Sequence, residues 1–120
     1  DVYVDLDGTL IYYTRFKDME GRLGKPRPGA REFLMAIRKS ARVIIYTARL
    51  CERYFSEAAL RKIGKHLQEN SLPYDEIYVG RGKPLCAAFV GDKNIEIPQN
   101  PVEADYDEAL IKVRRELEDA

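Results

Sequence analysis

The sequence has no long apolar run, no excess of charge of one sign and no signal sequence. A bilayer span needs about 20 consecutive apolar residues, and the N-terminus lacks the charged and then apolar pattern of a signal peptide. The 20 Lys and Arg residues balance the 20 Asp and Glu residues, so no net field draws the protein to nucleic acid or to anionic membranes. We therefore expect a cytoplasmic protein, with no membrane partner and no nucleic-acid partner indicated. Because the numbering begins at Asp1 rather than at a methionine, we leave open whether terminal residues are missing.

The chain is also poor in cysteine and histidine. Cys51 and Cys86 lie in unrelated segments without C-x-x-C spacing, and His66 is the single histidine, so a zinc cluster cannot be built and reduced thiols are expected. A cysteine-dependent phosphatase needs an arginine six residues after its cysteine, and those positions hold Glu57 and Asp92. His66 lies on or beside the apolar stripe of a predicted helix, which favours a structural or solvent-facing role.

The order of apolar strands and amphipathic helices predicts one α/β domain over residues 1–120, since this length has room for one hydrophobic core. Strands that alternate with helices imply right-handed crossovers, and hence a parallel sheet in a three-layer, Rossmann-like fold with helices on both faces. No stretch is long enough for a large cap domain, but aromatic residues and glycines between 11 and 25 favour a β-hairpin flap. Strands are predicted over 2–6, 43–46, 77–80 and 87–91, and helices over 30–40, 55–67 and 102–117.

Five polar residues lie at or just after the ends of predicted strands: Asp5, Asp7, Thr47, Lys83 and Asp92. In sheets of this kind ligands bind outside the carboxyl ends of the strands. A carboxylate that attacks phosphorus needs a cation to offset the repulsion between like charges, and Mg²⁺ with oxygen ligands suits this role. We assign Asp5 and Asp92 to the metal and Asp7 to proton transfer. Thr47 and Lys83 would then stabilise charge on the phosphoryl oxygens.

These residues fall in four segments that resemble the motifs of the haloacid dehalogenase (HAD) superfamily. The segments occur in the family's order and cover nearly the whole chain, which makes the resemblance more specific than any one of them. They are DLDGTL at 5–10 (motif I), VIIYT at 43–47 (motif II), GKP at 82–84 (motif III) and VGDKNIE at 90–96 (motif IV).

The HAD resemblance implies a Mg²⁺-dependent phosphatase. By that resemblance Asp5 would form an aspartyl-phosphate, and Asp7 would act as general acid and base. Thr47 and Lys83 would hold the phosphoryl group, while Asp92 would bind Mg²⁺ together with Asp5 and the main-chain carbonyl of Asp7. Four further residues of the same motifs are expected to contact the substrate: Gly8, Thr9, Ala48 and Arg49.

A narrower resemblance runs through residues 46–49 and 72–90, and it is to the small, uncapped HAD branch associated with capsular-polysaccharide biosynthesis. It makes a sugar phosphate the first substrate class to screen. That branch usually has a double aspartate in motif IV, where this chain has Gly91 before its single aspartate, and an Arg-Ala pair where this chain has Lys93 and Asn94. One acid is therefore lost. Gly-Asp is an accepted form of the motif, and the part played by Glu96, where many relatives place a second acid, is left open.

Each of these residues also has a plain structural interpretation. Asp92 could be a turn former or a helix cap, Lys83 a solvated lysine and Thr47 an ordinary strand residue. The shared spacing of the motifs favours function for all three. Arg49 is left open between a contact with substrate phosphate and an ion pair with an acidic side chain near the second predicted helix. Phe16 and the flap tyrosines are left open between hairpin packing and contact with a substrate.

Three functions are compatible with the sequence. The leading hypothesis is hydrolysis of a phosphomonoester through an aspartyl-phosphate on Asp5. The first alternative is a catalytically decayed, HAD-like binding or assembly module, which the replacement at Gly91 supports. The second is a phosphotransferase that uses the same intermediate. An open site admits bulky phosphorylated substrates unless a partner subunit closes it, and the sequence leaves the substrate and the oligomeric state open.

Overall fold

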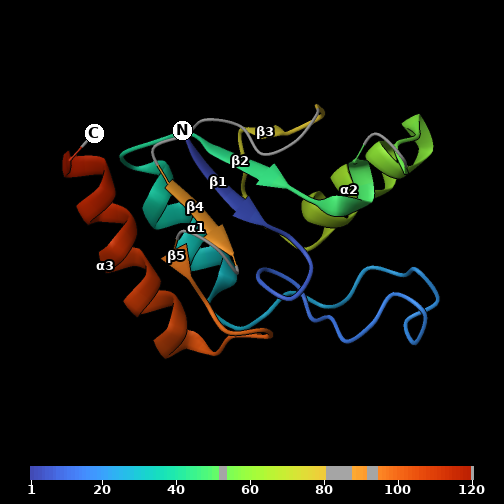
Figure 1. Ribbon diagram of the computed structural model, residues 1–120, viewed down its shortest axis with the longest axis horizontal. Coiled ribbons are helices and arrows are strands. Elements are labelled where there is room, and N and C mark those ends of the chain that lie inside the picture. The colour runs from blue at the N-terminus through green and yellow to red at the C-terminus, as the bar shows by residue number, and fades with distance from the viewer. Residues whose placement is uncertain (52–53, 81–87, 92–94, 120) are drawn as a thin grey trace.

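A parallel sheet with helices packed against it forms the described part of the chain, as the alternation of strands and helices predicts. The computed structural model describes residues 1–51, 54–80, 88–91 and 95–119. Within them, parallel strands are ordered β3-β2-β1-β4-β5 (Figure 1). No strand is predicted at β5, because Ile95 and Glu96 are not part of an apolar run such as the one that predicts β3. The elements are β1 (Val2–Asp5), α1 (Ala30–Arg38), β2 (Val43–Tyr46), the 3₁₀ helix η1 (Ala48–Leu50), α2 (Glu57–Glu69), β3 (Glu76–Ile77), β4 (Ala88–Gly91), β5 (Ile95–Glu96) and α3 (Glu103–Asp119).

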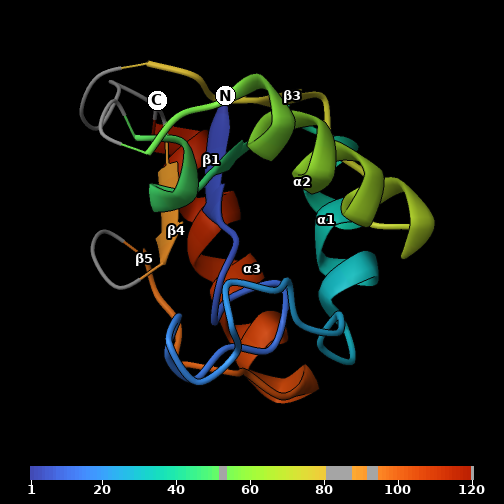
Figure 2. The ribbon, with the colours of Figure 1, turned by 90° about the vertical axis from the view of Figure 1, so that its right-hand side faces the viewer.

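The two faces of the sheet are packed differently. One face contributes alternating aliphatic residues of β1, β2 and β4 to a core that includes apolar residues of α1, α2 and α3. Figure 2 shows these three helices on one side of the strands. The crossovers through α1 and α2 advance in the same direction across the sheet, so their common right-handedness places both helices on the same face. The opposite face carries a smaller hydrophobic cluster in which Ile44 packs with four aromatic residues, Tyr3, Tyr46, Tyr78 and Phe89.

The arrangement of helices differs in one respect from the sequence prediction. Helices are expected on both faces of the sheet, but those in the described residues pack on one face only. Residues 81–87, which connect β3 to β4, lie outside the described residues. None of the helices in the described ranges is both long enough and apolar enough to cross a bilayer.

The boundaries of α2 show how local chemistry sets the limits of an element. The side chain of Ser56 accepts a hydrogen bond from the amide of Ala59 (3.0 Å) and so caps the first turn. The helix ends at Glu69, and Ser71 follows with a positive φ of 56°. The helix predicted over 55–67 is therefore shifted by two residues, because the cap and not the first apolar side chain determines where the helix begins.

The segment between β1 and α1 is a loop with a short antiparallel stem, and the prediction of a β-hairpin flap needs correction. Ile11 pairs with Pro26 in an isolated antiparallel bridge, and the amide of Tyr12 donates to the carbonyl of Lys25 (2.8 Å). Beyond this stem no ladder forms within the described flap, because side chains from elsewhere bind the main-chain groups of Tyr13. The tip, residues 14–22, is a series of bends and turns. We keep the name flap for residues 12–25.

Candidate active site

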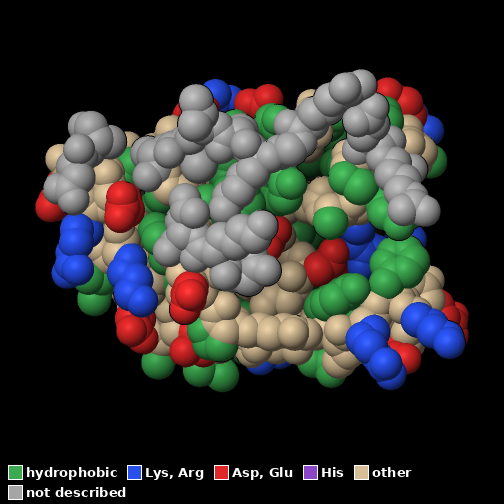
Figure 3. All heavy atoms as spheres, in the orientation of Figure 1, with side chains coloured by type: hydrophobic (Ala, Val, Ile, Leu, Met, Phe, Trp, Pro, Cys, Tyr) green, Lys and Arg blue, Asp and Glu red, His purple; other side chains and the backbone are tan. Residues whose placement is uncertain are grey.

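The parallel register brings the ends of β1, β2 and β4 to one edge of the sheet. Asp5 is opposite Tyr46 on β2, so Thr47 lies immediately beyond that pair. On the other side of β1, Val4 is opposite Val90, which places Gly91 beside Asp5. Figure 3 shows acidic and basic side chains adjoining in a hollow of the surface near the point where β1 ends in Figure 1.

Gly91 leaves space that the carboxylate of Asp5 occupies. A Cβ atom built on Gly91 would lie 2.8 Å from Oδ2 of Asp5 and 3.3 Å from its Cγ. Contacts as short as the first are essentially never made by real Cβ atoms. Close packing against Asp5 therefore explains why glycine suits position 91.

The turn after β1 explains why motif I needs a glycine at position 8. Gly8 has a φ of 77°, a left-handed conformation that favours glycine. Its amide donates to the carbonyl of Ile11 (2.9 Å), and the amide of Leu10 donates to the carbonyl of Leu6 (2.9 Å). Thr9 lies inside this tight turn and is 5 % exposed, so we find its side chain buried in the turn, where the sequence predicts a substrate contact.

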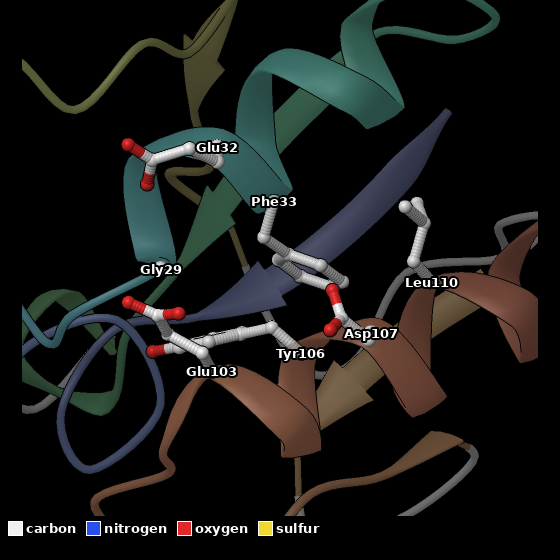
Figure 4. Close-up of a pocket in the computed structure, with 7 residues that line it drawn as sticks. All are labelled: Gly29, Glu32, Phe33, Glu103, Tyr106, Asp107 and Leu110. Carbon is white, nitrogen blue, oxygen red and sulfur yellow. The ribbon is translucent and has the colours of Figure 1, made fainter.

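The helix α3 supports the same turn from behind. The hydroxyl of Tyr106 donates to the main-chain carbonyl of Thr9, and burial raises the pKa of Tyr106 above its ordinary value. The ring of Tyr106 packs on Phe33 of α1, with centroids 5.2 Å apart. Figure 4 shows both rings at a surface pocket of about 300 Å³ between α1 and α3. The pocket is lined by Gly29, Glu32, Phe33, Glu103, Tyr106, Asp107 and Leu110.

Arg49 forms an ion pair with Asp7, the residue that the sequence assigns to proton transfer. Its Nε donates to Oδ2 of Asp7 (2.7 Å) and its Nη2 donates to Oδ1 (3.0 Å), which is the two-point geometry typical of arginine and carboxylate. The side chains of Arg49 and Asp7 are 12 % and 18 % exposed. Of the two roles that the sequence leaves open for Arg49, the structure therefore shows an ion pair. Its acidic partner is Asp7 of motif I and not a side chain near the second helix.

Arg49 is held in place by the start of η1 and by the flap. The hydroxyl oxygen of Thr47 accepts a hydrogen bond from the amide of Arg49 (3.2 Å), and Ala48 begins η1 between them. The guanidinium also donates to the carbonyls of Gly21 (2.7 Å) and Arg22 (3.1 Å). It lies over the ring of Phe16, 5.3 Å from the ring centroid.

Two side chains that sequence reasoning missed connect the flap to the segment after β5. The side chain of Asn100 accepts from the amide of Tyr13 (2.7 Å) and donates to its carbonyl (2.8 Å), and the side-chain amide of Gln99 also donates to that carbonyl (2.8 Å). Asn100 has a φ of 53°. The available signal was its position in a proline-flanked turn, where asparagine tolerates this conformation.

His66 connects α2 to the flap, which agrees with the structural role and not with the solvent-facing role of the two that the sequence leaves open. Its Nε2 lies 2.7 Å from the carbonyl oxygen of Gly24. A Cβ atom on Gly24 would lie 2.0 Å from the carbonyl oxygen of Tyr12, so this glycine allows the two arms of the flap to approach each other.

Tyr46 is the aromatic neighbour of the predicted nucleophile. Burial raises the pKa of Tyr46, and the adjacent carboxylate of Asp5 raises it further. Its ring stacks on Tyr78, with centroids 5.9 Å apart. The phenol therefore stays neutral at physiological pH, and it forms part of the wall beside Asp5.

Mg²⁺ requires oxygen ligands, and some of the residues at this edge can provide them. The carboxylate of Asp5 is present, whereas that of Asp7 is paired with Arg49, so the main-chain carbonyl of Asp7 is the donor atom that this residue would offer to Mg²⁺. No group of three or more potential metal-binding side chains occurs in the described ranges. Asp92, the third predicted ligand, lies outside the described residues, as do Lys83, Lys93 and Asn94. Among the described residues, the oxygen donors of Asp5 and Asp7 are of the kind that Mg²⁺ prefers, and the sequence predicts Asp92 as the third.

Comparison with known proteins gives one match. The family model of NLI interacting factor-like phosphatases matches residues 2–72, which include the turn after β1 and the Thr47 segment. No curated protein and no solved structure gave a significant match. The narrower resemblance to the capsular-polysaccharide branch therefore stays a prediction.

Proposed function

This chain belongs to the NLI interacting factor-like phosphatases, a HAD-like phosphatase family, and from that premise we propose that it hydrolyses a phosphomonoester with Mg²⁺ through an aspartyl-phosphate on Asp5. The observation that carries the proposal is the strand register, which places Asp5 between the Thr47 end of β2 and Gly91 of β4. Asp7, two residues further on, is turned towards the same edge by its contact with Arg49.

In the first step, an oxygen of Asp5 attacks phosphorus, and the bond from phosphorus to the leaving oxygen breaks. Asp7, which carries the proton that it took from water in the second step of the preceding turnover, gives that proton to the leaving oxygen. In the second step, water attacks phosphorus while Asp7 takes a proton from it, and the bond from phosphorus to Asp5 breaks. A Mg²⁺ ion held by Asp5, the carbonyl of Asp7 and Asp92 would supply positive charge that offsets the repulsion between carboxylate and phosphate.

Thr47 is suited to hold the transferring phosphoryl group. Its hydroxyl oxygen accepts the hydrogen bond from the amide of Arg49, so its proton is left to donate to a phosphoryl oxygen. The side chain is 5 % exposed, and a hydrogen bond made in such a site is stronger than one made in water. Lys83 would supply a second, charged donor, as the sequence motif predicts.

The close packing at Gly91 weakens the alternative of a decayed binding module. The missing first acid of motif IV was the sequence feature that supported loss of chemistry. Since a Cβ atom there would lie 2.8 Å from the carboxylate of Asp5, glycine at this position is compatible with a working nucleophile. A phosphotransferase would share every residue named above, so it differs only in the acceptor that replaces water.

A phosphate-release assay tests the proposal. A panel of phosphomonoesters, led by sugar phosphates, is assayed with Mg²⁺ and with EDTA, and the protein is compared with Asp5→Asn. We expect release that requires Mg²⁺ and falls by more than roughly a thousandfold in Asp5→Asn, because an amide cannot act as the nucleophile. Circular dichroism and thermal unfolding check that the variant is folded. Equal release by a folded Asp5→Asn would remove Asp5 as nucleophile, and added alcohol acceptors would reveal transfer.

A further inference from the structure

Arg49 uses most of its hydrogen-bonding capacity within the protein. A guanidinium carries five N–H donors, and hydrogen bonds extend from Nε and Nη2 to Asp7, from Nη1 to Gly21 and from Nη2 to Arg22. One N–H is left for any other acceptor. Arg49 could therefore grip a substrate phosphate with two donors only by releasing Asp7 or the flap.

The tip of the flap depends on this arginine. Within the described residues, hydrogen bonds reach residues 14–22 from outside the flap only through Arg49. The other contacts of the tip are local, such as the hydrogen bond from the amide of Gly21 to the carbonyl of Phe16 (3.0 Å). Asn100 and His66 bind the arms of the flap at Tyr13 and Gly24, and neither reaches the tip.

The same guanidinium fixes the orientation of Asp7. The two-point contact allows one orientation of the carboxylate plane, and each carboxylate oxygen keeps a second lone pair for a proton. The flap carbonyls and the Asp7 oxygens all bind one rigid, planar group, the guanidinium of Arg49. Displacement of the tip therefore removes two of the hydrogen bonds that the guanidinium makes. Displacement also removes the contact with Phe16.

We propose that Arg49 is a positioning residue that couples the flap to Asp7, so that Asp7 is oriented for proton transfer when the tip of the flap is in place. Only the effect on proton transfer by Asp7 rests on the proposed function. The coupling itself is a property of the contacts between Arg49, Asp7 and the flap. It reassigns an arginine that the sequence places among substrate-binding residues.

The test compares Arg49→Lys and Arg49→Gln with the control Arg38→Lys. Arg38 forms the same two-point contact with Asp75, through Nε (3.3 Å) and Nη2 (3.0 Å), on the loop before β3. Lysine keeps the charge but not the planar fork. We measure kcat/KM for an aryl phosphate, whose leaving group needs no proton, and for an alkyl phosphate, whose leaving group does. The expected loss in both Arg49 variants is roughly tenfold to a hundredfold larger for the alkyl ester, with both esters unchanged in Arg38→Lys.

The two esters distinguish positioning from direct binding. They carry the same phosphoryl group, so an equal loss for both would assign Arg49 to the phosphate and overturn the proposal. A gain of activity in Arg49→Gln would also overturn it, because the contact would then be inhibitory.

Hydrogen exchange tests the coupling without requiring activity. Amides of residues 14–22 are expected to exchange roughly tenfold faster in Arg49→Gln, since the variant loses charged hydrogen bonds to the flap, and to be unchanged in Arg38→Lys. Unchanged exchange in Arg49→Gln would refute the coupling even in an active enzyme. If the wild-type protein releases no phosphate but its flap exchanges as expected, the proposed function fails while the coupling stands.

Discussion

Gly91→Ala is a small perturbation aimed directly at the predicted nucleophile. The added methyl group would lie 2.8 Å from Oδ2 of Asp5 and 3.3 Å from its Cβ and Cγ. Gly91 is in β4, and its φ is not in the left-handed range, so alanine suits the backbone. Any effect of the substitution therefore comes from the contact with Asp5.

The size of the effect follows from the overlap. Ordinary contacts of a Cβ atom begin near 3.4 Å, so the carboxylate must move by about 0.6 Å. A 1 Å misplacement of a reacting group costs on the order of a hundredfold in rate, which makes a loss of roughly tenfold in kcat the expected result. Overpacking of a well-packed site also costs about 1 to 3 kcal/mol of stability.

Gly64→Ala is the matched control, because it makes the same change in α2. There the new Cβ atom meets its nearest neighbour, the hydroxyl of Tyr74, at 3.6 Å, which is ordinary contact. We expect unchanged kcat and a gain of about 0.5 to 1 kcal/mol in stability, since glycine is a poor helix residue.

A double-mutant cycle with Asp5→Ala identifies the source of the stability cost. Truncation of Asp5 removes Oδ2 and Cγ, so Gly91→Ala should cost at least about 1 kcal/mol less in that background. Urea unfolding of the four proteins measures this coupling energy. An identical cost with and without the Asp5 carboxylate, or full activity in Gly91→Ala, would refute the steric argument.

Two further predictions concern stability. Asn100→Ala loses both hydrogen bonds to Tyr13 and keeps a φ of 53°, so it should lower the free energy of unfolding, measured in urea, by about 2 kcal/mol. Asn100→Gly should lower it by about 1 kcal/mol less, because glycine adopts this φ without strain. Equal losses in the two variants would show that strain plays no part. The pKa of Asp75 is lowered below 3.8, first by the hydrogen bond from the amide of Val43 and then by Arg38, so its stabilisation is present above the unfolded pKa and is lost as pH falls through the folded pKa. Asp75→Asn should therefore destabilise the protein at neutral pH and much less in strong acid, whereas a cost independent of pH would contradict the assignment.

The sequence predicted the sheet because its strands are short apolar runs that end in motif residues. The runs at 2–6 and 43–46 became β1 and β2, and parallel pairing then necessarily brought Asp5 and the Thr47 segment together. The flap could not be predicted in the same way. Its aromatic residues and glycines favour a hairpin, but side chains distant in sequence bind its main-chain groups and prevent a ladder. Local propensity carries no information about such partners.

All of the side chains that anchor the flap bind main-chain atoms, and sequence patterns do not reveal contacts of this kind. Three separate parts of the chain supply these anchors. Arg49 of η1 contacts the main chain of Gly21 and Arg22, His66 of α2 contacts that of Gly24, and Asn100 of the loop after β5 contacts that of Tyr13. Such contacts do not require particular side chains in the flap, so the exposed ring of Tyr12 can change without loss of these anchors, whereas the ring of Phe16 contacts the guanidinium of Arg49. Arg49 also binds the side chain of Asp7 in motif I. This contact differs from the main-chain contacts, because the proposed proton transfer requires an aspartate at position 7. We therefore expect substitutions within the flap to alter substrate choice more readily than they alter proton transfer by Asp7.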